Sequence, residues 1–296
     1  MTSRRRVAQL ALFFLVLLHA LAFGAFFLRA HQLAESQVFL DARDQWRAGH
    51  LQLAAAEYRH FLAHYHATIQ PLLLAGSFPS EASAYFALGR VETDLNHVDA
   101  ALNAFDRAGR LEHGLGHRES RELLLQSGRF QQLISLSKQQ LTLEPDSLPA
   151  TADLAAALLL SGSAHAAAEQ YQRAIALVPA FLRRYDPLWN GPLSVQEAEF
   201  LNLAAVAELR AGNASSSAAT CASINTRAPA GIHLDHLCQA YLAHARHDDT
   251  ATLAALKGFL PQTAEQKALV QSLGVTTVTD KEPVNFSEQS GRGRLH

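Results

Sequence analysis

Paired histidines are the residues of this chain whose type and spacing could support metal chemistry. The chain contains 15 histidines among 296 residues, and several lie three or four positions apart. Two imidazoles one helical turn apart can bind a metal ion. The pairs are His60 with His64, His113 with His117, His233 with His236, and His244 with His247. They raise one hypothesis, a metal- or cofactor-binding accessory protein, for which His244, His247, Asp248 and Asp249 come closest to a ligand set.

Structural or surface histidine is the interpretation we favour. A metalloprotease helix carries Glu next to the first of its two histidines, and no pair here has that arrangement. The sequence also lacks a nucleophile elbow and a glycine-rich phosphate loop. We therefore predict no metal, no cofactor and no catalytic residue, and we do not expect an enzyme.

The two cysteines, Cys221 and Cys238, fall on consecutive predicted helices. A disulfide between such neighbours is geometrically possible, and an oxidising compartment would permit it. Two separately buried thiols fit the sequence equally well, so both interpretations stay open.

Composition predicts an all-α protein. Alanine and leucine dominate, and both favour helices. A net charge of -2 and a pI near 6.7 give no basic surface for a phosphate backbone, so we predict no nucleic-acid partner.

The first thirty residues predict a membrane anchor. Arg4, Arg5 and Arg6 precede an uncharged run over residues 7–28. As a helix this run would extend roughly 33 Å, enough to cross a bilayer core of about 30 Å. The arginines predict a cytoplasmic N-terminus over residues 1–6 and a periplasmic remainder at a bacterial inner membrane. Ala20-Leu21-Ala22 would also fit a cleaved signal peptide.

A segment then recurs at one interval: Gly162 lies 34 positions after Gly128, and Pro179 lies 34 after Pro145. The same register holds residues of matching size at equivalent places in two clear copies. These are Tyr85, Leu88, Gly89, Ala101, Phe105 and Ala108 in one, and Leu154, Ala155, Gly162, Ala167, Tyr171, Ala174 and Pro179 in the other. This pattern resembles the tetratricopeptide repeat family. The resemblance implies an α-solenoid of about five to six helical hairpins over residues 29–273, followed by a disordered tail over 274–296.

The resemblance also implies where a partner would bind, because the first helix of each hairpin lines the concave face in that family. By register this face holds Phe39, Arg43, Trp46, Arg47, Phe86, Arg90, Asp94, Asn202, Val206, Leu209 and Arg210. Some family members clamp a peptide carboxylate with Lys and Asn, but Phe39 and Phe86 occupy two of those places. An insertion after Pro179 adds Tyr185 and Trp189, which either contact a partner or fill a gap between stacks.

These features predict a membrane-anchored scaffold for protein–protein interactions in the assembly or maturation of an envelope complex. Its partners would be membrane or periplasmic proteins in the concave groove and the lipid bilayer through residues 7–28.

Overall fold

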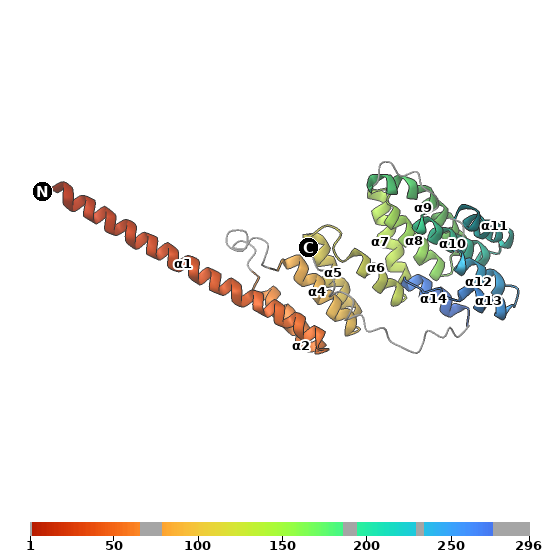
Figure 1. Ribbon diagram of the computed structural model, residues 1–296, viewed down its shortest axis with the longest axis horizontal. Helices are drawn as coiled ribbons and strands as arrows, with labels where there is room; N and C mark the ends of the chain where they lie inside the picture. Colours follow the sequence, from red (N-terminus) through yellow and green to blue (C-terminus); the bar gives the residue numbers. More distant parts are fainter. Residues whose placement is uncertain (1, 66–78, 186–193, 229–233, 275–296) are drawn as a thin grey trace. The chain divides into compact units, whose positions relative to one another are not determined.

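The computed structural model describes residues 2–65, 79–185, 194–228 and 234–274, and within these ranges no side chain is described for 2–14, 27–33, 35 and 185. Every regular element in the described ranges is an α-helix, as predicted (Figure 1). The chain divides into two compact units, residues 1–120 and 121–296. We describe each unit by itself.

Unit 1 is built from two antiparallel helical hairpins. Its helices are α1 (Thr2–Arg47), α2 (Leu51–Ala63), α4 (Glu81–Asp94) and α5 (Val98–Leu111), and α2 packs between α1 and α4. Ser80 begins α4, since its hydroxyl accepts the backbone N–H of Ser83. Tyr58 and Phe61 are among the largest side chains that the unit buries completely.

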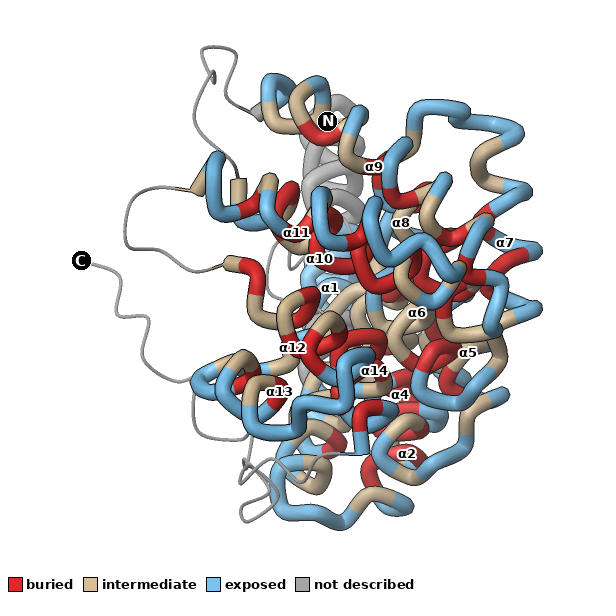
Figure 2. The backbone as a smooth tube through the Cα atoms, turned by 90° about the vertical axis from the view of Figure 1, so that its right-hand side faces the viewer, coloured by how far each residue is buried: buried red, intermediate tan, exposed pale blue. Residues whose placement is uncertain are grey.

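Unit 2 continues the same hairpin pattern. Its helices are α6 (His117–Gln126, which begins just before the unit boundary), α7 (Phe130–Leu143), α8 (Leu148–Leu160), α9 (Ala164–Tyr185), α10 (Val195–Arg210), α11 (Ala214–Arg227), α12 (His236–His244), α13 (Asp249–Leu256) and α14 (Ala264–Ser272). Most residues of α8 and α10 are buried, because helices pack against them on several sides (Figure 2).

One turn recurs between the two helices of every hairpin. Each turn has one residue with positive φ, between 60° and 89°: Gly49, Asn96, Gly128, Gly162, Gly212 and His247. The next N–H bonds to the carbonyl five residues back, as His50 does to Gln45 and Asp248 to Ala243. These two features define the Schellman helix end. Six equivalent turns in the described residues give six hairpins, the upper limit of the prediction.

The two clear sequence copies pack as predicted. Ala101, Phe105 and Ala108 on α5 are buried, and so are Ala167, Tyr171 and Ala174 on α9. Gly89 lets Phe105 approach α4, because a Cβ there would lie 2.6 Å from two ring carbons. Small residues therefore set the distance between helices, as the repeat pattern requires.

Helix α1 differs from the predicted layout because it continues without a break from Thr2 into the first hairpin. Leu15, Phe23 and Phe26 on this helix are exposed. Within the described residues, no helix has the length and apolar character needed to cross a membrane. The span predicted over residues 7–28 is therefore not supported here, and the side chains of 7–14, 27 and 28 lie outside the description.

Helix α9 is also longer than the repeat predicts, since it passes through Pro179 and ends at Tyr185. Phe181 and Leu182 on the added turn pack against the core of unit 2, and this burial supports the extension. The predicted tail beyond Gly274 lies outside the described residues.

Candidate protein-binding surfaces

In unit 1 the structure brings three of the predicted partner-binding residues together. The Trp46 indole N–H donates to Asp94 Oδ2 at 2.7 Å, and the Arg90 guanidinium lies 4.8 Å from the centre of the Trp46 ring. Trp46 comes from α1, whereas Arg90 and Asp94 come from α4, so the cluster joins the first helices of two hairpins. Trp46 is half-buried, and Arg90 and Asp94 are exposed. We call these three residues the Trp46 cluster.

The two predicted groove phenylalanines are half-buried and pack against the core of unit 1. Phe39 lies edge-on to Tyr58 and Phe61, with ring centres 5.4 and 5.5 Å apart. Phe86 lies 5.9 Å from Phe105. Both rings therefore pack beneath the face formed by α1 and α4 and extend little from it.

The predicted arginines of α1 differ in how far they are exposed. Arg47 exposes 64 % of its side chain and Arg43 exposes 40 %. Both lie near Asp44, at 3.7 and 3.6 Å, which neutralises part of their charge. Of these two arginines, Arg47 is thus the one more available to a partner.

The predicted α10 residues have structural roles in unit 2. Asn202 is buried, where its amide nitrogen donates to the Ala198 and Leu234 carbonyls and its oxygen accepts the Cys238 N–H. Val206 is also buried and Leu209 is half-buried in the core. Register alone missed this, because α12 packs against α10 and the segment around it bonds to Asn202.

Arg210 is exposed as predicted but already paired. Its guanidinium donates to Tyr241 Oη at 2.9 Å and to Ser272 Oγ at 2.7 Å. Of the predicted insertion residues, Tyr185 ends α9 with its side chain outside the description, and Trp189 lies outside the described residues.

The last helix takes a place that the sequence does not predict. We expect 263–273 to form a final helix that closes the end of the array, and the helix and its Thr263–Gln266 capping box are present. Instead of stacking on the last hairpin alone, α14 lies across the first helices of the hairpins of unit 2. It contacts α6, α8, α10 and α12 (Figure 1). We call the surface formed by these four helices the inner face of unit 2.

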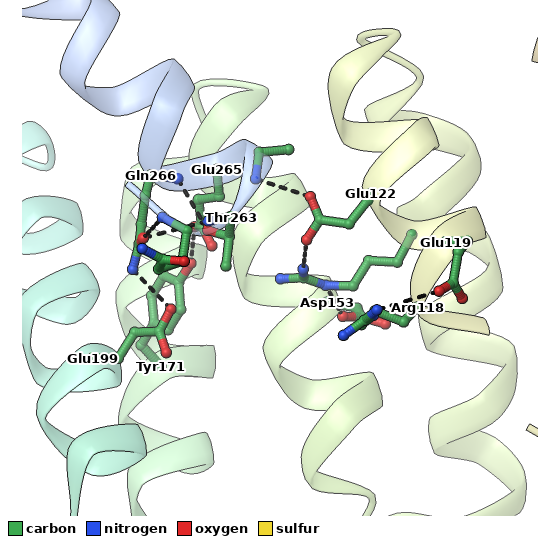
Figure 3. Close-up of polar contacts among 12 residues, drawn as sticks. Arg118, Glu119, Glu122, Asp153, Tyr171, Glu199, Thr263, Glu265 and Gln266 are labelled. Carbon is green, nitrogen blue, oxygen red and sulfur yellow. Dashed lines mark hydrogen bonds and ion pairs between the residues drawn. The ribbon is translucent and has the colours of Figure 1, made fainter. Parts of the chain in front are cut away.

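Polar contacts join the start of α14 to this face (Figure 3). The N–H of Ala264 donates to Glu122 Oε2 at 2.9 Å, and the Gln266 amide donates to Glu199 Oε1 at 2.9 Å. The Tyr171 hydroxyl, from the buried aromatic position of the repeat, donates to the Glu265 carboxylate. Sequence reasoning missed these contacts, and the capping box was the signal that this helix is well defined.

Glu265 is almost completely buried, with 2 % of its surface exposed. Burial raises its pKa to about 7, which the Tyr171 hydrogen bond and Arg121 oppose and which Glu199 and Asp153 assist. Burial likewise raises the pKa of Glu199. Arg121 is shared between Asp153 and Glu122, so the cluster contains more carboxyl groups than cations.

Where the structure describes the histidine pairs, they do not gather into a metal site. Among the described residues, no group of three or more His, Cys, Asp and Glu side chains could hold a metal ion. His247 occupies the turn of the sixth hairpin with a φ of 60°, and Asp248 caps α13 by accepting the Ala251 N–H. His233 lies outside the described residues.

The structure settles the cysteine alternative in favour of a disulfide. Cys221 on α11 and Cys238 on α12 are bonded, and both are fully buried. The bond links the fifth hairpin to the sixth covalently.

Comparisons with solved structures give distant matches. No protein-family model and no curated protein matches the chain. Among solved structures, the MamA protein of Desulfovibrio magneticus RS-1 is 13% identical, with a TM-score of 0.43 over 65% of this chain and 94% of that one. PilF of Pseudomonas aeruginosa is 14% identical, with a TM-score of 0.42 over 82% and 99%. A tetratricopeptide repeat protein of Parabacteroides merdae is 11% identical, with a TM-score of 0.38 over 82% and 100%. The repeat architecture is therefore supported by the six equivalent turns and the repeated packing positions of this chain.

Proposed function

We propose that this protein is a scaffold that binds other proteins through the first helices of its hairpins, and that it acts at a membrane. The observation that carries the proposal is the Trp46 cluster. A half-buried tryptophan held by an aspartate and covered by an exposed arginine is the kind of site that dominates protein interfaces. Both contacts hold the indole in one orientation before a partner arrives, which lowers the entropy cost of binding.

The proposed partner is a membrane or periplasmic protein of an envelope complex that presents a helix or an extended segment. Arg90 is an exposed cation against the Trp46 ring, and Arg47, the next residue of α1, is a second exposed cation. Acidic side chains on the partner would complement these cations and speed association.

The proposed location is the exported side of a bacterial inner membrane. Three features support it: Arg4–Arg6 before an uncharged run, exposed Leu and Phe side chains on α1, and a buried disulfide. Disulfides persist in oxidising compartments and are rare in the cytosol. Anchoring would confine the search for a partner to the membrane surface and so raise its effective concentration.

The proposal is tested by affinity capture from detergent-solubilised membranes with the full chain and with charge reversal of the exposed cations. We expect the variant Arg47→Glu/Arg90→Glu to lose a captured protein that the unaltered chain retains. Trp46→Ala should weaken capture by roughly 2 kcal/mol, about 30-fold in affinity. Quantitative mass spectrometry measures both effects.

Arg107→Glu is the matched control, because Arg107 is an exposed cation on α5, the second helix of its hairpin. This variant should capture as well as the unaltered chain. If all variants capture the same proteins equally, the Trp46 cluster is not a binding surface.

A further inference from the structure

Helix α14 has the features of a helical ligand seated on unit 2. It is nine residues long, and helices of this length are not stable alone in water. One side is buried through Ala264, Glu265, Leu269 and Val270, whereas Lys267 and Gln271 on the other side are exposed. An amphipathic helix whose apolar side lies against the helices of another body is a common mode of protein recognition.

Charge around the N-terminal turn of α14 does not match. The inner face of unit 2 presents Glu122, Asp153 and Glu199 here, with Arg121 as the cation among them. Arg121 is paired with Asp153 and Glu122. Among the described residues, Glu199 forms no ion pair and accepts the Gln266 amide, and Arg121 acts on it as a cation at longer range. Glu265 of α14 adds a further carboxyl group to this surplus and is buried with it.

The apolar contacts of α14 are suited to any helix of the same shape, whereas the Arg210 bond to Ser272 Oγ is particular to this one. Leu269, Val270 and Leu273 fill the apolar part of the inner face beside Tyr241, whose hydroxyl donates to the Leu269 carbonyl at 2.8 Å. This bond goes to the backbone, and the same hydroxyl also lies 2.6 Å from Ser272 Oγ. A foreign helix with the same apolar spacing would therefore keep the apolar contacts and the backbone bond. It would lose the mismatched charge, together with the side-chain hydrogen bonds of Glu265, Gln266 and Ser272.

We propose that the inner face of unit 2 is a second binding surface for a short amphipathic helix of another protein, and that α14 is its removable occupant. The fitting helix has apolar residues where α14 has Leu269, Val270 and Leu273, and a basic residue where α14 has Glu265. The basic side chain pairs with Glu199 and removes the surplus negative charge. This surface lies in unit 2, so its test is independent of the Trp46 cluster in unit 1.

The experiment measures binding of two synthetic peptides to the full chain at pH 8. Both have the sequence of residues 260–274, and one carries Glu265→Lys. We expect the lysine peptide to bind at least about tenfold more tightly, since it replaces a repelled carboxylate with a cation. Fluorescence anisotropy of labelled peptide gives the affinities. Hydrogen exchange should show the α14 amides of the chain becoming less protected as the lysine peptide binds.

Matched variants separate this surface from nonspecific attraction. The chain variant Glu199→Gln should lose about tenfold in affinity for the lysine peptide. Glu144→Gln is the control and should lose none, because Glu144 is an exposed carboxylate that makes no contact with α14. A lysine peptide that also carries Leu269→Asp should not bind.

Three results would overturn the proposal. One is the absence of saturable binding of the lysine peptide up to about 1 mM, the effective concentration that a short tether gives α14. Another is equal affinity of the two peptides. The third is binding that leaves the exchange of α14 unchanged, because the peptide would then sit elsewhere and α14 would be a fixed part of the core.

Discussion

At the scale of single residues, Glu265 is a carboxyl group in an environment very different from water. Its pKa is about 7 in the folded chain and 4.5 ordinarily. Between these pH values it is therefore protonated in the folded chain and loses the proton on unfolding. The groups that face it are Tyr171, Arg121, Glu199 and Asp153. The contribution of Glu265 to the free energy of unfolding is therefore fully favourable below about pH 4.5. It decreases as the pH rises and is lowest above about pH 7.

This predicts the behaviour of Glu265→Gln. The amide keeps the shape and carries no charge, so the variant should be more stable than the unaltered chain at pH 8, by up to roughly 3 kcal/mol. Below pH 4.5 the difference should be small. Chemical denaturation at both pH values measures it, and an equal effect at pH 4 and pH 8 would mean that the carboxyl group does not titrate between them.

Gly89 is a second residue with a determined role. Gly89→Ala would place a methyl carbon 2.6 Å from the Phe105 ring, so the ring or α4 must move. We expect a loss of about 1–3 kcal/mol in the free energy of unfolding. Gly24→Ala is the control, because a Cβ there meets nothing within 4 Å. Thermal unfolding followed by circular dichroism compares the two, and equal melting temperatures would contradict the close packing.

At the scale of elements, the six turns show how one backbone conformation can be made by different residues. Four turns use glycine, and Asn96 and His247 adopt the same left-handed conformation. Asparagine tolerates this region better than most residues, whereas histidine adopts it at a cost. Glycine therefore marks four of the six turns in the sequence, whereas histidine gives no such signal in the sixth hairpin.

His247→Gly should stabilise the sixth hairpin by about 1 kcal/mol, because glycine adopts positive φ without a steric cost. His247→Val should destabilise it, since a β-branched residue fits this region poorly. His244→Gly is a useful contrast, because it places glycine at the last helical residue of α12 and should destabilise. Urea denaturation gives the order of stability, and a stabilising His247→Val would contradict a turn role.

At the scale of the whole molecule, the disulfide relates the fold to its compartment. Cys221 and Cys238 are separated by 17 positions, and closing a loop of this size contributes roughly 3 kcal/mol to stability. We expect the exported chain to hold the bond and a chain without residues 1–28, retained in the cytosol, to have two free thiols and a lower melting temperature. Alkylation followed by mass spectrometry distinguishes the two, and free thiols in the exported chain would contradict the proposed location.

The sequence by itself determined the helices, the hairpin period and the small residues at the helix contacts. These follow from local propensity and from spacing within one hairpin, which neighbouring residues set. It also brought Trp46, Arg90 and Asp94 to one face, because register within adjacent repeats is a local property.

Only the tertiary structure decided which predicted surface residues are covered. Asn202 is buried and Arg210 is paired because α12 and α14 pack over α10, and α14 reaches Glu122 from more than a hundred positions away. Likewise, Glu265 has a raised pKa because distant helices exclude water from it. Contacts of this kind depend on where the chain returns in space, and no periodicity in the sequence records that.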